Sequence, residues 1–447
     1  MSPMPAGQPD DLIATEAPLD QAGIACSAAE LQRTLDESRR GFELRQVPTA
    51  AAEHWSVIDG ALQHRSRSFF SVNGVSDGAR SALLLYQPQA AVTGALSARV
   101  GGERWFLLQA RAEPGCLGEA QFGPTVQSTP ANYLRLHGGA ATPYVESFIA
   151  FDPRISVLDD TTQLDLGERY LAKCKRSILL ETPAPAAPQP SFVWATPSAL
   201  AEAVLRSAFL NIDIRSILAV ARWSARPGEG ELTPKSAALR HSLASPPRPA
   251  VLGELLARLH RTAPARSRFV PLAELDNWRQ TEMGWSEREP RQGFSVDFFQ
   301  VTAAFREVGS WVQPLVNSAT PGQVILACRE RGGLLEFFLR PVAERGFVTA
   351  AAVAPSYVRY PGAAGLPPAW LQPPSARLWS ETTESDEGGR FYRDASAYQI
   401  VRTDDAAGPE EPDGAWLRLS ELKLLLCTSN ACTIQLRGIV SQLLAAD

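Results

Sequence analysis

The chain repeats itself, and this internal repeat is the strongest constraint on its fold. Residues 101–124 align without a gap on residues 332–355, and each segment starts with Gly-Gly and ends with Pro. Further along, Trp194, Ser207, Ile212, Arg215 and Ile217 keep one constant spacing from Trp416, Ser429, Ile434, Arg437 and Ile439. A match this regular over so many positions predicts a tandem duplication of one unit.

Three shorter matches extend the repeat toward the N-terminus. Val47-Pro48 and Trp55 align with Val270-Pro271 and Trp278. Phe69-Phe70-Ser71-Val72 aligns with Phe298-Phe299-Gln300-Val301, and Gln87-Pro88 aligns with Gln313-Pro314. Both copies also contain short β-type runs bounded by Gly or Pro, which favour mixed sheets.

Four segments follow from this pattern. Residues 1–41 form an N-terminal tail and a helix that Ser27 can cap. Residues 42–224 are the first copy and 267–447 the second, and helices flank the strands in each. Residues 225–266 form a linker with one amphipathic helix, for which we expect packing across the two copies. The expected fold class is α+β.

One polar stretch, residues 123–139, is where the two copies differ most. Continuing the gapless alignment places Gln127 on Val358, Asn132 on Ala363 and Tyr133 on Ala364. Taken alone, the stretch could be a polar turn between strands. If the stretch were only a structural turn, both copies should have kept or lost its polar residues together. We therefore interpret the first copy as the working site and the second as degenerate.

Composition excludes several classes of function. The net charge of −5 gives no basic field for nucleic acid, and no apolar run approaches membrane-spanning length. Six scattered cysteines lack a Cys-x-x-Cys pair, and the five histidines show no ligand spacing, so we expect no metal. We find no export signal and expect a cytoplasmic protein. We find no Gly-x-Gly-x-x-Gly motif and expect that the protein needs no cofactor.

Several motifs resemble the NDP-hexose 2,3-dehydratase family over nearly the whole chain from about residue 42. They are Phe69-Phe70-Ser71-Val72, Glu113-Pro114-Gly115, Pro124-Thr125-Val126-Gln127 with Asn132-Tyr133 and His137, the 173–181 segment, and Asn211-Ile212-Asp213 with Arg215. The resemblance implies two Nudix-like modules in tandem, a homodimer, and a dTDP-4-keto-6-deoxyglucose substrate that loses its 2-hydroxyl. A 3-ketoreductase is then the expected consumer of the labile product.

Dehydration beside a ketone needs a base, a group that stabilises the enolate and an acid, and side chains can supply all three. His137 is the first candidate for proton transfer, and Tyr133 is its rival and a candidate enolate donor. The candidate substrate-binding residues are Gln87, Glu113, Gln127, Thr129, Asn132, Arg135, Lys173 and Arg176. Arg215 recurs in the second copy as Arg437, so we expect it to be structural.

Two other functions stay open. A Nudix pyrophosphohydrolase needs a cluster of Mg²⁺-binding carboxylates, and neither copy contains such a box. A non-catalytic nucleotide-sugar binder or assembly protein is the second alternative. Leu85 stands where the family usually has the Trp that Trp311 supplies in the second copy, so we expect weak base stacking and only modest preference for dTDP over UDP.

Overall fold

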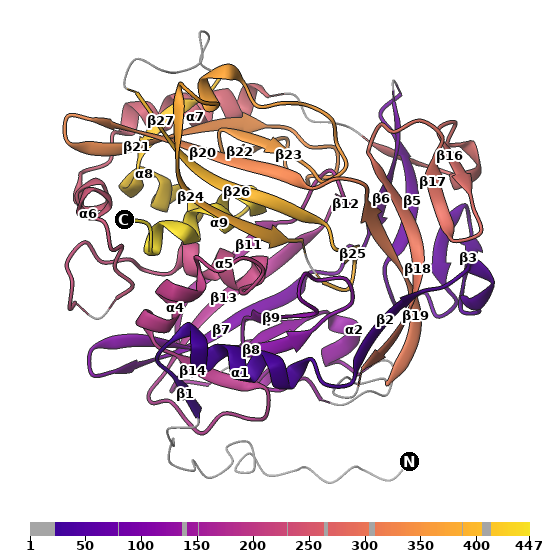
Figure 1. Cartoon of the computed structure of the whole chain (residues 1–447), viewed down its shortest axis with the longest axis horizontal. Helices are drawn as coiled ribbons and strands as arrows, with labels where there is room; N and C mark the ends of the chain where they lie inside the picture. The colour runs from indigo at the N-terminus through magenta and orange to yellow at the C-terminus, as the bar shows by residue number, and fades with distance from the viewer. Residues whose placement is uncertain are drawn as a thin grey trace.

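The protein is a mixed α/β molecule built from two large and two small sheets (Figure 1). The computed structural model describes residues 23–78, 80–135, 141–150, 152–229, 231–262, 267–303, 309–386, 388–404 and 413–447. None of the described helices is long and apolar enough to cross a membrane.

The large sheet of the first copy has the strand order β1-β14-β8-β7-β13-β11, with β10 beside β7 and β9 beside β8. Its strands are β1 Ile24–Ala25, β7 Ala91–Val100, β8 Glu103–Ala112, β9 Ala120–Gly123, β10 Val126–Ser128, β11 Ser156–Leu164, β13 Cys174–Thr182 and β14 Phe192–Ala195. The central strand β7 runs antiparallel to β8 and parallel to β13, which makes the sheet mixed.

The large sheet of the second copy repeats this arrangement in the order β22-β21-β20-β26-β24, with β23 beside β20 and β27 beside β21. Its strands are β20 Gly322–Arg331, β21 Leu334–Val342, β22 Ala352–Ala354, β23 Tyr357–Arg359, β24 Ala376–Ser385, β26 Ala395–Thr403 and β27 Ala415–Arg418. The Thr125 hydroxyl bridges β7 and β8, and the Ser356 hydroxyl bridges β20 and β21 in the same way. The duplication predicted from the sequence is therefore present in the hydrogen bonding.

The two small sheets exchange one strand each, so neither copy is a separate body. The first contains β12 Tyr170–Leu171, β6 Ser81–Tyr86, β5 Ser71–Ser76, β4 Ala61–His64 and β3 Trp55–Ile58, and it takes β15 Arg268–Val270 from the second copy. The second contains β16 Trp278–Gln280, β17 Gly284–Glu287, β18 Phe294–Ala303, β19 Ser310–Ser318 and β25 Phe391–Tyr392, and it takes β2 Phe42–Gln46 from the first.

The register of these small sheets corrects one sequence match. Leu62 pairs with Val72 on β5, as Trp285 pairs with Val296 on β18. Phe70-Ser71-Val72 therefore corresponds to Phe294-Ser295-Val296, and its alignment with residues 298–301 is wrong. The slip arose because a second Phe-rich run follows the true match within the same long strand.

The same register corrects the assignment of Leu85. Leu85 lies opposite Val72, and Val316 lies opposite Val296, so Leu85 corresponds to Val316. The match of Gln87-Pro88 with Gln313-Pro314 is wrong for the same reason. Leu85 is fully buried, and Trp311 is not its counterpart in the second copy.

Helices cover the outer faces and fill the junction between the copies. They are α1 Ala28–Ser38, α2 Pro130–Tyr133, α3 Glu146–Ile149, α4 Pro197–Ala203, α5 Ile212–Val220, α6 Ala237–Ala244, α7 Pro249–Arg261, α8 Leu419–Leu426 and α9 Ile434–Ser441. Figure 1 shows α5 and α9 side by side between the two large sheets, where every residue of both is buried. Helix α7 packs mainly on β21 and β27 of the second copy, whereas we expected it to bridge the copies.

Charged groups are buried beside this junction, and the copies pair them differently. Asp165 lies 3.2 Å from the Lys175 ammonium and 3.7 Å from that of Lys173. In the second copy, Asp386 corresponds to Asp165, Ser396 to Lys175 and Asp394 to Lys173. Burial first, and the Asp394 carboxylate next, raise the pKa of Asp386 to about 8.

We expect this carboxyl group to make stability fall as the pH rises. Between about pH 4 and 8 the native state holds a proton that the unfolded chain has released, so the free energy of unfolding declines by on the order of a few kcal/mol. Asp386→Asn should flatten the decline of Tm between pH 5 and 8 in calorimetry. The exposed Asp404→Asn is the control, and an unchanged slope in D386N would contradict the assignment.

Candidate functional site

A cavity of about 640 Å³ lies between the small sheets and the loop after β10. Both copies line it, because strand exchange brings β18 and β19 against the β3–β4 hairpin. The lining residues are Ala51, Glu53, His54, Trp55, His64, Ser66, Ser68, Phe69, Phe70, Gln87, Thr129, Ala131, Asn132, Arg135, Gln300, Ser310, Trp311, Val312, Gln313 and Arg390. Its volume suits a nucleotide-sized ligand.

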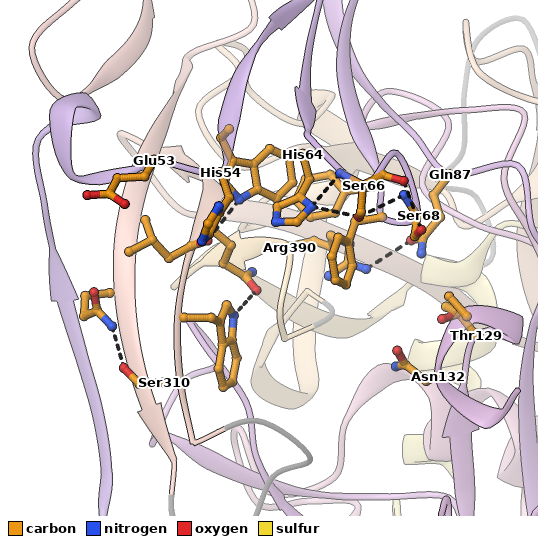
Figure 2. Close-up of a pocket in the computed structure, with 18 of the residues that line it drawn as sticks. Glu53, His54, His64, Ser66, Ser68, Gln87, Thr129, Asn132, Ser310 and Arg390 are labelled. Atoms are coloured by element: carbon orange, nitrogen blue, oxygen red, sulfur yellow. Dashed lines mark hydrogen bonds between the residues drawn. The ribbon is translucent and has the colours of Figure 1, made fainter. Parts of the chain in front are cut away.

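Part of the predicted polar stretch forms one end of this cavity. Pro130 opens the short helix α2 directly after Thr129, and the turn places Thr129 and Asn132 toward the cavity (Figure 2). Arg135 follows the helix with φ of 56°, a left-handed conformation that costs a non-glycine residue about 1 kcal/mol or more.

The β3–β4 hairpin supplies two histidines to the rim. The His64 imidazole packs edge-on against Phe69 at 4.8 Å and lies 5.7 Å from the His54 ring. Its Nδ1 is 2.8 Å from the Ser66 hydroxyl and 3.2 Å from the Ser66 backbone nitrogen, which donates to it. These contacts orient the ring through Nδ1, and an imidazole is a side chain that can exchange a proton near neutral pH.

Gln87 is buried at the inner wall beside two cations. Its Oε1 accepts from the Lys173 Nζ at 3.3 Å. It also accepts from the Arg390 Nη2 at 3.2 Å (Figure 2). Lys173 is itself buried over the Tyr170 ring, 4.1 Å from its centroid. Lys173 therefore lies behind Gln87 and does not line the cavity.

The second copy contributes the opposite wall. The Trp311 indole nitrogen donates to the Gln313 Oε1 at 2.7 Å, and the Gln313 amide donates to the Gly389 carbonyl at 2.7 Å. These bonds fix the nitrogen-bearing edge of the Trp311 indole. The Arg390 guanidinium lies 4.3 Å from the centroid of the Phe70 ring.

The Glu113-Pro114-Gly115 motif holds the loop that carries Arg390. The Pro114 carbonyl accepts from the Gly389 backbone nitrogen at 2.8 Å, and the Gly115 carbonyl accepts from that of Arg393 at 2.6 Å. A Cβ on Gly115 would lie 1.9 Å from the Phe391 carbonyl oxygen, so only glycine fits. Glu113 pairs with Arg111 beneath this loop rather than lining the cavity.

The other predicted residues lie elsewhere. Gln127 accepts a hydrogen bond of 2.9 Å from Asn211, which caps α5, and Tyr133 packs into the apolar cluster beneath the large sheet. Arg176 forms an exposed ion pair with Asp160 on neighbouring strands. His137 lies outside the described residues.

Sequence reasoning missed His54, His64, Trp311 and Arg390. A signal for the histidines exists in the sequence, since the second copy has Asn277 and Glu287 at the matching hairpin positions. For Trp311 and Arg390 no local signal exists, because contacts between the two copies bring them to the first: strand exchange for Trp311, and the bonds to Pro114 and Gly115 for the Arg390 loop.

The corresponding place in the second copy is filled. A Cβ on Gly293 would lie 1.8 Å from the Gly362 carbonyl oxygen, so the two backbones touch. Phe69 and Ala131 hold these positions in the first copy, and both line the cavity. Tyr360, which replaces Thr129, is half-buried and donates to the Glu344 carboxylate at 2.6 Å. Among the described residues no cluster of three metal-ligating side chains occurs.

Comparisons with known proteins agree with this duplicated architecture. The sequence profile described as NDP-hexose 2,3-dehydratase matches residues 29–221 and again 251–443. A dTDP-4-dehydro-6-deoxy-α-D-glucopyranose 2,3-dehydratase of Streptomyces violaceoruber is 28% identical over 90% of this chain and 93% of its own length. The enzyme of that name from Amycolatopsis orientalis is 27% identical over 95% and 92%. The chain thus belongs to the NDP-hexose 2,3-dehydratase family.

Proposed function

We propose that the protein removes the 2-hydroxyl of dTDP-4-keto-6-deoxyglucose in the cavity at the first copy. The observation that carries this proposal is one cavity lined by imidazole, amide, hydroxyl and guanidinium groups. The two similar enzymes reported above are named as 2,3-dehydratases of this substrate.

Elimination can proceed in two steps with side chains alone. A base takes the proton on carbon 3, and the electrons of that bond form an enolate whose charge lies on the carbon-4 oxygen. When the carbonyl re-forms, the carbon 2–oxygen bond breaks, and an acid protonates the leaving hydroxide to give water. The enol product then tautomerises to the 3,4-diketone.

We assign proton transfer to His64, since it lines the cavity and one ring nitrogen is held by Ser66. His137 and Tyr133 are the alternatives from the sequence. Thr129 and Asn132 can bind sugar hydroxyls, and Arg135 can bind the diphosphate through its guanidinium fork. Lys173 acts through Gln87, while Glu113, Gln127 and Arg176 are structural in this proposal.

The test is turnover of dTDP-4-keto-6-deoxyglucose by the intact protein, with a 3-ketoreductase present to trap the labile product. Loss of substrate and appearance of the 2-deoxy product are expected. Binding of the substrate without turnover would favour the non-catalytic alternative. Because we propose no metal or cofactor, prior dialysis against EDTA should leave the rate unchanged.

Trp311 offers the indole face on which the thymine base can stack. Trp311→Ala should weaken dTDP binding by about 1–3 kcal/mol, roughly 5- to 150-fold, in calorimetry. The thymine methyl group adds about 0.8 kcal/mol, so the preference for dTDP over UDP should stay below tenfold. Trp379→Ala, which removes an indole elsewhere in the second copy, is the control. Equal binding by W311A and the wild type would place the base elsewhere.

The family resemblance supports further proposals. We propose two Nudix-like modules, a homodimer, a cytoplasmic location and a 3-ketoreductase that consumes the product. We also propose that the second copy serves as scaffold, which the contact between Gly293 and Gly362 supports.

A further inference from the structure

We propose that the Gln87 side-chain amide is the hydrogen-bond donor that stabilises the enolate oxygen, and that Lys173 and Arg390 fix its orientation. The inference rests on the proposed dehydration. It gives a residue of the second copy a part in the chemistry of the first.

The orientation of the amide follows from its neighbours. Lysine and arginine side chains can only donate hydrogen bonds, so the Gln87 oxygen must face both of them. The distances to that oxygen are 3.3 Å from Lys173 and 3.2 Å from Arg390. With the oxygen held on both sides, the NH₂ group is the part of the amide that faces the cavity.

The surroundings keep this arrangement rigid. Gln87 is 5% exposed, and Lys173 is 4% exposed over the Tyr170 ring. Arg390 stacks on Phe70 and also donates to the Gly389 carbonyl, whose residue is tied to Pro114. The amide therefore needs no reorganisation when charge develops on a substrate oxygen, which is the condition for effective transition-state stabilisation.

The cations at the amide oxygen strengthen the same effect, Lys173 from behind the wall and Arg390 from within it. They polarise the Gln87 carbonyl and make its NH₂ group a better donor, although Asp165, 3.7 Å from Lys173, balances part of the charge. Figure 2 shows Gln87 near Thr129 and Asn132, the residues proposed to bind the sugar, and away from Ser310. A ketone oxygen of the bound sugar can therefore lie at Gln87 while the nucleotide extends toward Trp311.

Gln87→Glu is the decisive variant, because a carboxylate of the same shape can still pair with both cations but cannot donate. We expect kcat to fall by about 10²-fold or more with KM within threefold. Exchange of the carbon-3 hydrogen with deuterated solvent should slow in parallel, since enolate formation is the affected step. The exposed Gln89→Glu makes the same chemical change outside the cavity and should keep wild-type kinetics.

Two further variants test the positioning residues. Arg390→Lys keeps the charge and should retain more activity than Arg390→Met, a graded rescue that a purely structural role would not give. If Q87E does not fold, Gln87→Met replaces it, with folding checked by circular dichroism.

The outcomes separate this inference from the proposed function. If the wild type does not turn over the substrate, the proposed function fails. If the wild type is active and Q87E keeps kcat within threefold, or changes only KM, Gln87 is not the enolate donor.

Discussion

His64→Asn is expected to lower kcat for dehydration by about 10²- to 10⁴-fold, the usual contribution of a general acid–base group. The variant keeps a polar side chain beside Ser66 but removes the nitrogen that can exchange a proton in the cavity. Binding of dTDP should change little, because Trp311 is proposed to contact the thymine ring and Arg135 the diphosphate. Kinetics with the ketoreductase trap and calorimetry with dTDP measure the two effects.

His137→Asn is the informative comparison. If His137 transfers the proton, its variant shows the large loss and H64N stays within a few-fold of the wild type. His241→Asn, on an exposed turn of α6, controls for loss of any imidazole. Equal activity of all three variants would exclude both His64 and His137 as the proton-transfer group.

Arg215→Met is expected to lower the free energy of unfolding by about 3–5 kcal/mol, because it leaves a buried carboxylate without its cation. The Arg215 Nη2 lies 2.6 Å from the Glu384 Oε1, and both side chains are almost completely buried between the copies. This burial and pairing support the prediction that Arg215 is structural. Denaturant unfolding followed by fluorescence measures the loss.

A second substitution separates the pair from its packing. Burial raises the pKa of Glu384 to about 7 even with Arg215 in place. Removing the cation raises it further, so R215M should lose more stability as the pH increases from 6 to 8. R215M/E384Q should recover part of the loss. Arg226→Met, which breaks an exposed pair with Glu229, should cost less than about 1 kcal/mol, and a similar loss in both single variants would contradict this account.

The duplication and its register over β8, β9 and β10 could be predicted because the two copies align there without gaps. The alignment failed over β5 and β6, where Phe-rich runs recur within one strand and give two plausible registers. Sequence also found the Thr129–Arg135 turn, because its polar groups are neighbours along the chain. It could not bring Trp311 and Arg390 to Gln87, since more than two hundred residues separate them. Contacts between the copies close that distance: the exchange of β2 and β15, and the bonds from the Arg390 loop to Pro114 and Gly115.

That exchange of β2 and β15 has the form of a strand-swapped dimer whose two subunits have become one polypeptide. In a homodimer every mutation appears in both subunits, so two symmetric sites must be kept or lost together. Fusion of the genes removes this restriction, and each half can then accumulate its own substitutions. The second half could therefore lose its own pocket, where Gly293 and Gly362 now touch, and still contribute Trp311 and Arg390 to the cavity of the first half.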